Sequence, residues 1–353
     1  MRYRILLTLL LPLGSLAAQE LDSAQWARLH AWQAEAGAAR LEVGVMQAGA
    51  ITWYSVLQDT ILINQPTELY YEIGSITKPL MGLALHQYLA TLPADLETPV
   101  SDWLPDTLSW AGRGPDTLRL RHLVTHHSGM PRMPPNLRES FINPFDPFLN
   151  YQPTHLFAWM EAWQPEHRPD SVFEYSNLGA GLVTYAALRH SGLTLTDYTQ
   201  RYLGEPLQVS GIGYDIPDSL VVLPYHSAGY NSVRWHFTET LAGAGALRAT
   251  PAAMGAILRT LAQPPTPALA AWVHQSTAAL ATTEIGPIGT FWIHGSLEAT
   301  GKTFYWHNGQ TQGYESYLAW IEGEGTGIVI LSNRMAHQVT PMGMAWLQEL
   351  GGE

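Results

Sequence analysis

The sequence predicts an α/β (α+β) fold with one antiparallel sheet built from both ends of the chain, flanked by helices and carrying an inserted, mostly helical part. Two observations support this prediction. β-rich runs lie near both termini, and helical runs separated by proline-rich loops occupy the middle. We expect residues 19–75 and 262–353 to form the α/β part and residues 76–261 the mostly helical part.

The spacing of apolar residues predicts a helix and then two strands near the N-terminus. Residues 21–40 repeat apolar side chains at helical spacing and predict an amphipathic helix. The β-rich runs 41–46 and 51–56 are separated by small residues around Gly49, which predicts a hairpin.

Later elements are predicted in the same way. Residues 81–89, 178–189 and 251–261 are expected to be helices, whereas the proline-rich segment 130–169 is expected to be irregular and to form a lid or a site wall. Residues 304–307, 314–321 and 327–332 are expected to be strands, and a closing helix is expected near 340–350.

The first 18 residues have the basic, apolar and small-residue order of a secretory signal peptide. We therefore expect a mature chain of residues 19–353 in the periplasm or the medium, with a retained N-terminal anchor as the alternative. No later run reaches the roughly 18 apolar residues of a membrane span, so no integral membrane segment is expected after removal of the signal.

Composition excludes several functions. The 18 basic residues against 30 acidic ones give a net charge of −12, which argues against nucleic-acid binding. The chain has no cysteine, so disulfides, thiolate nucleophiles and cysteine-ligated metals are excluded. With 46% hydrophobic and 14% charged residues the protein is globular; its oligomeric state is left open.

An S-x-x-K pattern joins Ser75 to Lys78, one of two lysines in the chain. Pro79 fits the first turn of the helix that follows, so Ser75 is expected at the helix N-terminus with the lysine amine within reach of its hydroxyl. The helix dipole disfavours the ammonium form there, as a proton acceptor requires. The alternative is a capping serine with a solvated lysine.

Two further elements follow in order. Tyr175 and Asn177 precede a predicted helix, and His307 and Gly309 lie on a strand, His307 being the last residue of the run 304–307. A tyrosine can relay a proton, and an asparagine can hold both a lysine amine and a substrate amide. A glycine on a strand lets a substrate backbone lie against the strand edge.

Together these patterns resemble the serine β-lactamase and penicillin-binding-protein superfamily, in the branch of class C β-lactamases, DD-peptidases, D-aminopeptidases and related esterases. Residues 120–129 (LRHLVTHHSG) and 243–250 (GAGALRAT) also match this branch. The resemblance covers most of the chain and implies a β-lactamase/transpeptidase-like fold.

The resemblance also implies residue roles. Ser75 would be the acylated nucleophile, Lys78 and Tyr175 would share the base and acid roles, and Asn177 would orient lysine and substrate. The backbone amides of Ser75 and Gln310 would form the oxyanion hole. His307, Gly309 and Gln310 would bind substrate.

One departure concerns the substrate. His307 stands where typical β-lactamases have a lysine. The fixed positive charge of lysine is thus replaced by the charge of a histidine, which is expected to depend on pH. The best expectation is an exported serine hydrolase acting on a small amide or ester, such as a D-amino-acid peptide or a cell-wall peptidoglycan fragment. The alternatives are a carboxylesterase, a class C-like β-lactamase, and a non-catalytic binding or scaffolding homologue.

No cofactor is expected. His122 and His126 have the i, i+4 spacing of zinc ligands, but no third ligand is evident and the family signature accounts for the segment as scaffold. No metal site is therefore predicted.

Overall fold

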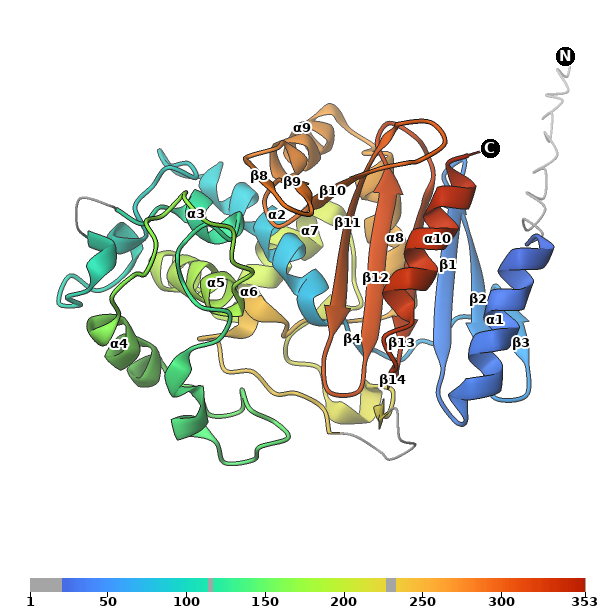
Figure 1. Cartoon of the computed structure of the whole chain (residues 1–353), viewed down its shortest axis with the longest axis horizontal. Helices are drawn as coiled ribbons and strands as arrows, with labels where there is room; N and C mark the ends of the chain where they lie inside the picture. Colours follow the sequence, from blue (N-terminus) through green and yellow to red (C-terminus); the bar gives the residue numbers. More distant parts are fainter. Residues whose placement is uncertain (1–20, 114–116, 227–232, 353) are drawn as a thin grey trace, which may run out of the picture.

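The computed structural model describes residues 21–113, 117–226 and 233–352. The predicted signal peptide, residues 1–18, lies outside this range. A large sheet occupies one side of the molecule and a helical region lies beside it (Figure 1). Within the described residues, every helix is too short or too polar to cross a membrane.

The main sheet joins the two ends of the chain. Its strand order is β3-β2-β1-β13-β12-β11-β10-β9-β8, and neighbouring strands are antiparallel. The strands are β1 (Leu41–Gln47), β2 (Ala50–Val56), β3 (Ile61–Ile63), β8 (Ala281–Thr283), β9 (Gly286–Ile288), β10 (Ile293–Ser296), β11 (Thr303–Gln310), β12 (Glu315–Ile321) and β13 (Gly327–Ser332). Because β1 pairs with the hairpin partner β2 on one side and with C-terminal β13 on the other, the predicted antiparallel sheet is confirmed.

Both faces of the sheet are covered by helices. In β12, Tyr317 and Ala319 pack with α1 (Ser23–Ala36) and α10 (Val339–Leu350), whereas the alternate residues Leu318 and Trp320 belong to the core on the other face. That second face is covered by α8 (Pro251–Ala262), which contacts β1, β12 and β13. Alternate residues of β12 therefore belong to two different hydrophobic cores, one on each face of the sheet.

The remaining elements form the helical region and its small sheets. The helices are α2 (Thr77–Leu89), α3 (Leu120–Val124), α4 (Pro153–Ala162), α5 (Asn177–Ser191), α6 (Leu195–Thr199), α7 (Glu205–Leu207) and α9 (Pro267–Thr277). The short helical turns are η1 (Gly74–Ile76), η2 (Val100–Trp103), η3 (Ala111–Arg113), η4 (Pro135–Ser140), η5 (Gln200–Gly204), η6 (Asp218–Leu220) and η7 (Ala242–Ala244). One small sheet contains β4 (Tyr71–Glu72), β7 (Arg248–Ala249) and β5 (Ile212–Gly213), and another pairs β6 (Tyr225–His226) with β14 (Arg334–Met335).

The structure corrects three local predictions. The segment 130–169 is not wholly irregular, because η4 and α4 lie within it; α4 buries Leu156, Trp159 and Met160 at helical spacing. The helix predicted at 81–89 begins four residues earlier, at Thr77, and Ser75 lies in the tight turn η1 before it. The sequence analysis also missed α9 and β8 to β10.

Close backbone packing holds η1 against β11. A Cβ atom added to Gly309 would lie 2.0 Å from the Ile73 carbonyl oxygen and 2.3 Å from Ser316 Oγ, and one added to Gly74 would lie 2.6 Å from the Gln310 nitrogen. Gly74 also has φ +49°, a conformation that favours glycine. The turn that carries Ser75 therefore needs glycine on both sides of this contact.

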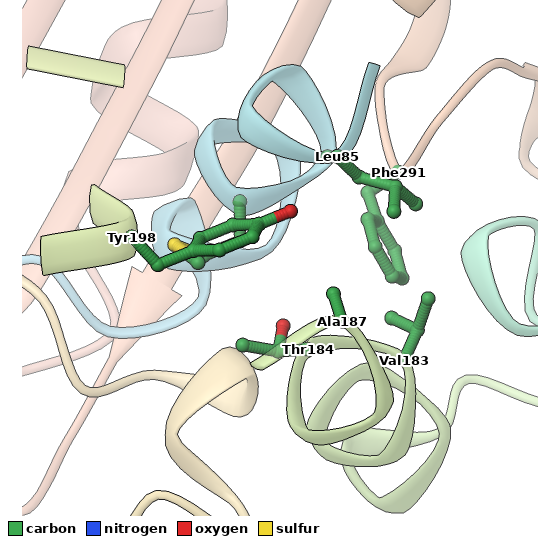
Figure 2. A pocket seen from close by; sticks show the side chains of 8 residues that line it. Leu85, Val183, Thr184, Ala187, Tyr198 and Phe291 are labelled. Carbon is green, nitrogen blue, oxygen red and sulfur yellow. The ribbon is translucent and has the colours of Figure 1, made fainter. Parts of the chain in front are cut away.

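A small cavity of about 10 Å³ lies between α2, α5 and α6, lined in part by Thr184, Tyr198 and Phe291 (Figure 2). The buried Tyr198 hydroxyl has no hydrogen-bond partner among the described residues. Tyr88, whose ring centroid lies 5.7 Å from that of Tyr198, does have one, because its hydroxyl lies 2.6 Å from His190 Nδ1.

We expect Gly309→Ala to lower the free energy of unfolding by about 1–3 kcal/mol, because the Ile73 carbonyl and Ser316 Oγ must move to admit the methyl group. Denaturant unfolding measures this change. Gly179→Ala is the control, since its added Cβ would meet neighbours at 3.4 Å and beyond, which is ordinary contact. Equal stability of the two variants would contradict the packing argument.

We expect Tyr198→Phe to leave the free energy of unfolding unchanged or raise it by up to about 1 kcal/mol, because it removes a buried hydroxyl that has no partner. Tyr88→Phe, the matched variant, breaks a hydrogen bond and should lower it by about 1 kcal/mol. Thermal unfolding of both variants measures the two changes. A larger loss of stability in Tyr198→Phe than in Tyr88→Phe would contradict the prediction.

Candidate active site

The serine and lysine of the S-x-x-K pattern are in contact. Lys78 Nζ lies 2.8 Å from Ser75 Oγ and donates to the Ala244 carbonyl oxygen at 2.6 Å. Lys78 lies in the first turn of α2 and its side chain is fully buried. The alternative of a solvated lysine beside a capping serine is therefore wrong.

The environment of Lys78 favours its neutral form. Burial lowers the pKa of this amine well below its ordinary value of 10.5, and the positive charge of Arg132 lowers it further. A neutral amine can donate to the Ala244 carbonyl and still accept the proton of Ser75 through its lone pair. The geometry thus provides a base beside the serine hydroxyl.

Tyr175 completes the group around Ser75. Burial raises the pKa of its phenol to about 12, although a hydrogen bond with Ser75 and the charge of Arg132 act in the opposite direction. Lys78 Nζ lies 5.0 Å from the ring centroid and the Arg132 guanidinium carbon lies 4.9 Å from it. Tyr175 is therefore a neutral phenol at neutral pH, suited to relaying a proton and not to removing one unaided.

His126 holds the segment that carries Tyr175. Its Nδ1 accepts the backbone N–H of Ser176 at 3.1 Å, its carbonyl oxygen accepts the N–H of Glu174 at 2.8 Å, and its ring centroid lies 4.4 Å from that of Tyr175. His126 has φ +61°, which is uncommon for a residue with a Cβ. The structure thus places His126 in the scaffold, as the sequence analysis predicted.

His307 lies behind Tyr175, with 6.3 Å between the ring centroids, and is buried. Burial lowers the pKa of the imidazole to about 3 despite a hydrogen bond from Nδ1 to the Asn308 carbonyl. The expected pH-dependent charge near neutrality is therefore wrong, because an imidazole shielded from water stays uncharged there.

The other predicted residues lie near this group. Asn177 and Gln310 line the same cleft as Ser75, and Gly309 packs beneath the Ser75 turn. The Asn177 amide contacts Met133 Sδ at 3.3 Å. Among the described residues, the second partner of Lys78 is thus the Ala244 carbonyl and not the predicted Asn177 amide.

The cleft has a volume of about 730 Å³. Ser75, Tyr175 and the amide side chains lie on its polar side. Its apolar lining comes from the proline-rich segment, from residues 235–237, from the β8 to β11 part of the main sheet and from β14. It includes Met133, Leu137, Phe141, Pro144, Pro147, Phe148, Trp235, Phe237, Ile285, Ile293, Trp306 and Met335. The predicted role of segment 130–169 as a site wall is confirmed.

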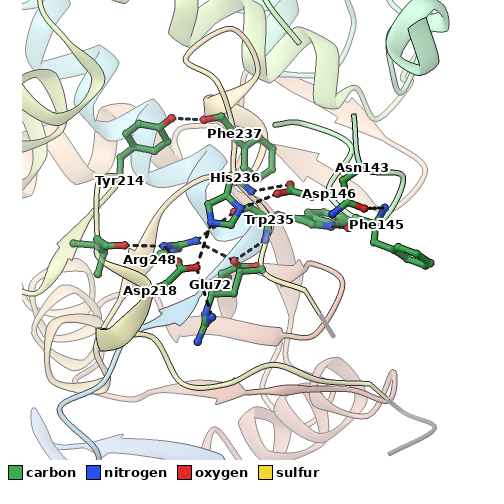
Figure 3. Close-up of polar contacts among 12 residues, drawn as sticks. Glu72, Asn143, Phe145, Asp146, Tyr214, Asp218, Trp235, His236, Phe237 and Arg248 are labelled. Atoms are coloured by element: carbon green, nitrogen blue, oxygen red, sulfur yellow. Dashed lines mark hydrogen bonds and ion pairs between the residues drawn. The ribbon is translucent and has the colours of Figure 1, made fainter. Parts of the chain in front are cut away.

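Polar contacts fix this wall (Figure 3). Asp146 accepts hydrogen bonds from the backbone N–H of His236 at 2.9 Å and from its Nδ1 at 2.7 Å, which raises the pKa of the imidazole. Glu72 accepts the N–H of Trp235 at 2.9 Å and pairs with Arg248 at 3.5 Å. Because Glu72 lies in β4, just before the Ser75 turn, the aromatic wall is tied to the nucleophile's own segment.

Sequence reasoning missed two contributors. The Ala244 carbonyl lies in the segment 243–250 that was noted for its resemblance, but a backbone oxygen leaves no residue-type signal. Arg132 follows the segment 120–129 by three residues, and nothing in its spacing indicated that it would reach Tyr175. In residues 21–113, 117–226 and 233–352, no group of three His, Cys, Asp or Glu side chains is arranged to hold a metal ion.

Solved structures of similar fold cover nearly the whole chain. A class C beta lactamase from Rhodobacter sphaeroides aligns with a TM-score of 0.76 at 18% identity, over 93% of this chain and 99% of that one. A Beta-Lactamase/D-Alanine Carboxypeptidase from Pseudomonas syringae aligns with a TM-score of 0.77 at 17% identity, over 94% and 99%. At these identities the likeness establishes the fold, and confirms the predicted β-lactamase/transpeptidase-like architecture.

Sequence comparison gives the family. A Beta-lactamase from Yersinia enterocolitica is 27% identical over 150 residues, which are 42% of this chain and 35% of that relative, so the match spans about a third of the relative's length. The Beta-lactamase family model matches residues 13–351. The chain therefore belongs to the Beta-lactamase family, whose members include serine hydrolases.

Proposed function

We propose that this protein is a serine hydrolase that forms an acyl-enzyme on Ser75. The observation that carries the proposal is the buried Lys78 amine, 2.8 Å from Ser75 Oγ and oriented by the Ala244 carbonyl. A serine hydroxyl is a weak nucleophile until a neighbouring base takes its proton. Burial lowers the pKa of the amine and so favours the neutral form that can act as that base.

The proposed steps use the residues in contact. Ser75 Oγ bonds to the acyl carbon while its proton passes to Lys78 Nζ; the carbon–nitrogen or carbon–oxygen bond to the leaving group breaks, and the leaving group takes a proton relayed by Tyr175. The backbone amides of Ser75 and Gln310 are the proposed oxyanion donors. Water then attacks the acyl carbon, and its proton returns through the same residues to Ser75 Oγ.

The proposed substrate is a small amide or ester, first of all a D-amino-acid peptide or a peptidoglycan fragment, acted on outside the cytoplasm after removal of residues 1–18. Two of the structural neighbours are described as Beta-lactamase/D-alanine carboxypeptidase, and the second half of that description supports this choice. A carboxylesterase is the second candidate, favoured by the largely apolar cleft and by the uncharged His307.

We expect Ser75→Ala to abolish turnover of 4-nitrophenyl acetate, by at least about 10⁴-fold, because no other group replaces the nucleophile. Intact-mass measurement after rapid quenching should show one acetyl adduct on the unmodified chain and none on the variant. Ser109→Ala changes an exposed serine outside the cleft and should react normally. An adduct on Ser75→Ala, or no adduct on the unmodified chain, would contradict the proposal.

We expect kcat/KM for a neutral ester to rise with pH and to level off far below pH 10.5, because Lys78 must lose its proton to act and its pKa is lowered by burial and by Arg132. Activity should thus be lost as pH falls through the Lys78 pKa. Stopped-flow measurement from pH 4 to 10 gives the profile. A rise centred near pH 10.5 would show that the lysine is not desolvated. Lys78→Arg should lose at least about 10²-fold at every pH.

A further inference from the structure

We propose that Arg132 binds an anionic group, such as a carboxylate, on the leaving-group side of the substrate. This inference rests on the proposed function and adds the substrate class to it. Arg132 lines the cleft together with Ser75 and Tyr175, and it lies in the loop before η4.

The charge of the cleft supports an anionic ligand. Of the described residues that line it, Arg132 is the one with a formal charge at neutral pH, and none is an aspartate or a glutamate. No described acidic side chain forms an ion pair with its guanidinium. In a chain with net charge −12, an unpaired cation in a concave and largely apolar site attracts an anion locally.

The position of Arg132 indicates which part of the substrate it meets. Its guanidinium carbon lies 4.9 Å from the centroid of the Tyr175 ring, and the Tyr175 phenol is hydrogen-bonded to Ser75. In the proposed reaction this phenol delivers the proton to the leaving group. A group held by Arg132 therefore lies beside the residue that protonates the leaving group, and on this ground we place it on the leaving-group side.

The chemistry of arginine suits a carboxylate. Among the described residues the guanidinium has no ion-pair partner, so its N–H donors are available for a bidentate pair with a carboxylate. The strand residue His307 is buried and uncharged, so β11 supplies no cation for such a group. Arg132 thus supplies to the cleft a positive charge that His307 does not.

The test compares two esters of equal acyl group, 4-nitrophenyl butyrate and 3-carboxy-4-nitrophenyl butyrate, which differ by one carboxylate on the leaving group. Because Arg132 also lowers the pKa of Lys78, the two proteins are compared on the plateau of each pH profile, above the Lys78 pKa. There we expect Arg132→Gln to lower kcat/KM for the carboxylated ester by about 10- to 100-fold and for the neutral ester by less than about threefold. Arg132→Lys should recover part of the lost kcat/KM, because lysine restores the positive charge but not the paired N–H donors of the guanidinium. Arg138→Gln, an equal change of charge on an exposed residue outside the cleft lining, should affect neither ester.

Two outcomes would overturn the proposal. The first is an equal loss of kcat/KM for both esters in Arg132→Gln, with the rise of kcat/KM shifted to higher pH. This result would show that Arg132 acts only through the pKa values of Lys78 and Tyr175. The second uses two esters that differ by a carboxylate on the acyl group, 4-nitrophenyl hemiadipate and 4-nitrophenyl hexanoate. If Arg132→Gln lowers kcat/KM only for the hemiadipate, Arg132 binds an anion on the acyl side and the proposal is wrong. Intact-mass measurement of Arg132→Gln tests the proposed hydrolase function separately. A butyryl adduct on Ser75 means that this function still holds even if the role of Arg132 does not.

Discussion

The contact between the turn that carries Ser75 and strand β11 is the constraint on which the site depends. Gly74 and Gly309 leave no room for side chains, and Ser316 Oγ donates to the Ile73 carbonyl at 2.8 Å across the same contact. The nucleophile segment is therefore held directly against the sheet. Because β11 belongs to a sheet assembled from both ends of the chain, the position of Ser75 depends on the whole fold.

Burial is the main physical cause of the site's chemistry. It lowers the pKa of Lys78 and of His307 and raises that of Tyr175, so burial favours the uncharged form of each group. A base and a proton relay can then act on one serine without a strong local charge. The remaining cation, Arg132, lies on the exposed side of Tyr175, where a substrate can meet it.

The wall of the cleft is built from segments distant in sequence. Asp146 with His236, and Glu72 with Trp235, join the proline-rich loop and the segment after residue 232 to the strand before the nucleophile. These contacts fix apolar side chains opposite the catalytic group. The shape of the cleft therefore depends on contacts between segments that meet only in the folded chain.

The sequence by itself determined the antiparallel sheet from both termini, the principal helices and the residues Ser75, Lys78, Tyr175, His307 and Gly309, because hydrophobic period and motif spacing are local properties of the chain. It could not determine that His307 is uncharged, that the Ala244 carbonyl orients the lysine, or that Arg132 reaches Tyr175. Only the tertiary structure decided these points, because charge state depends on burial and contacts between distant segments depend on how loops pack.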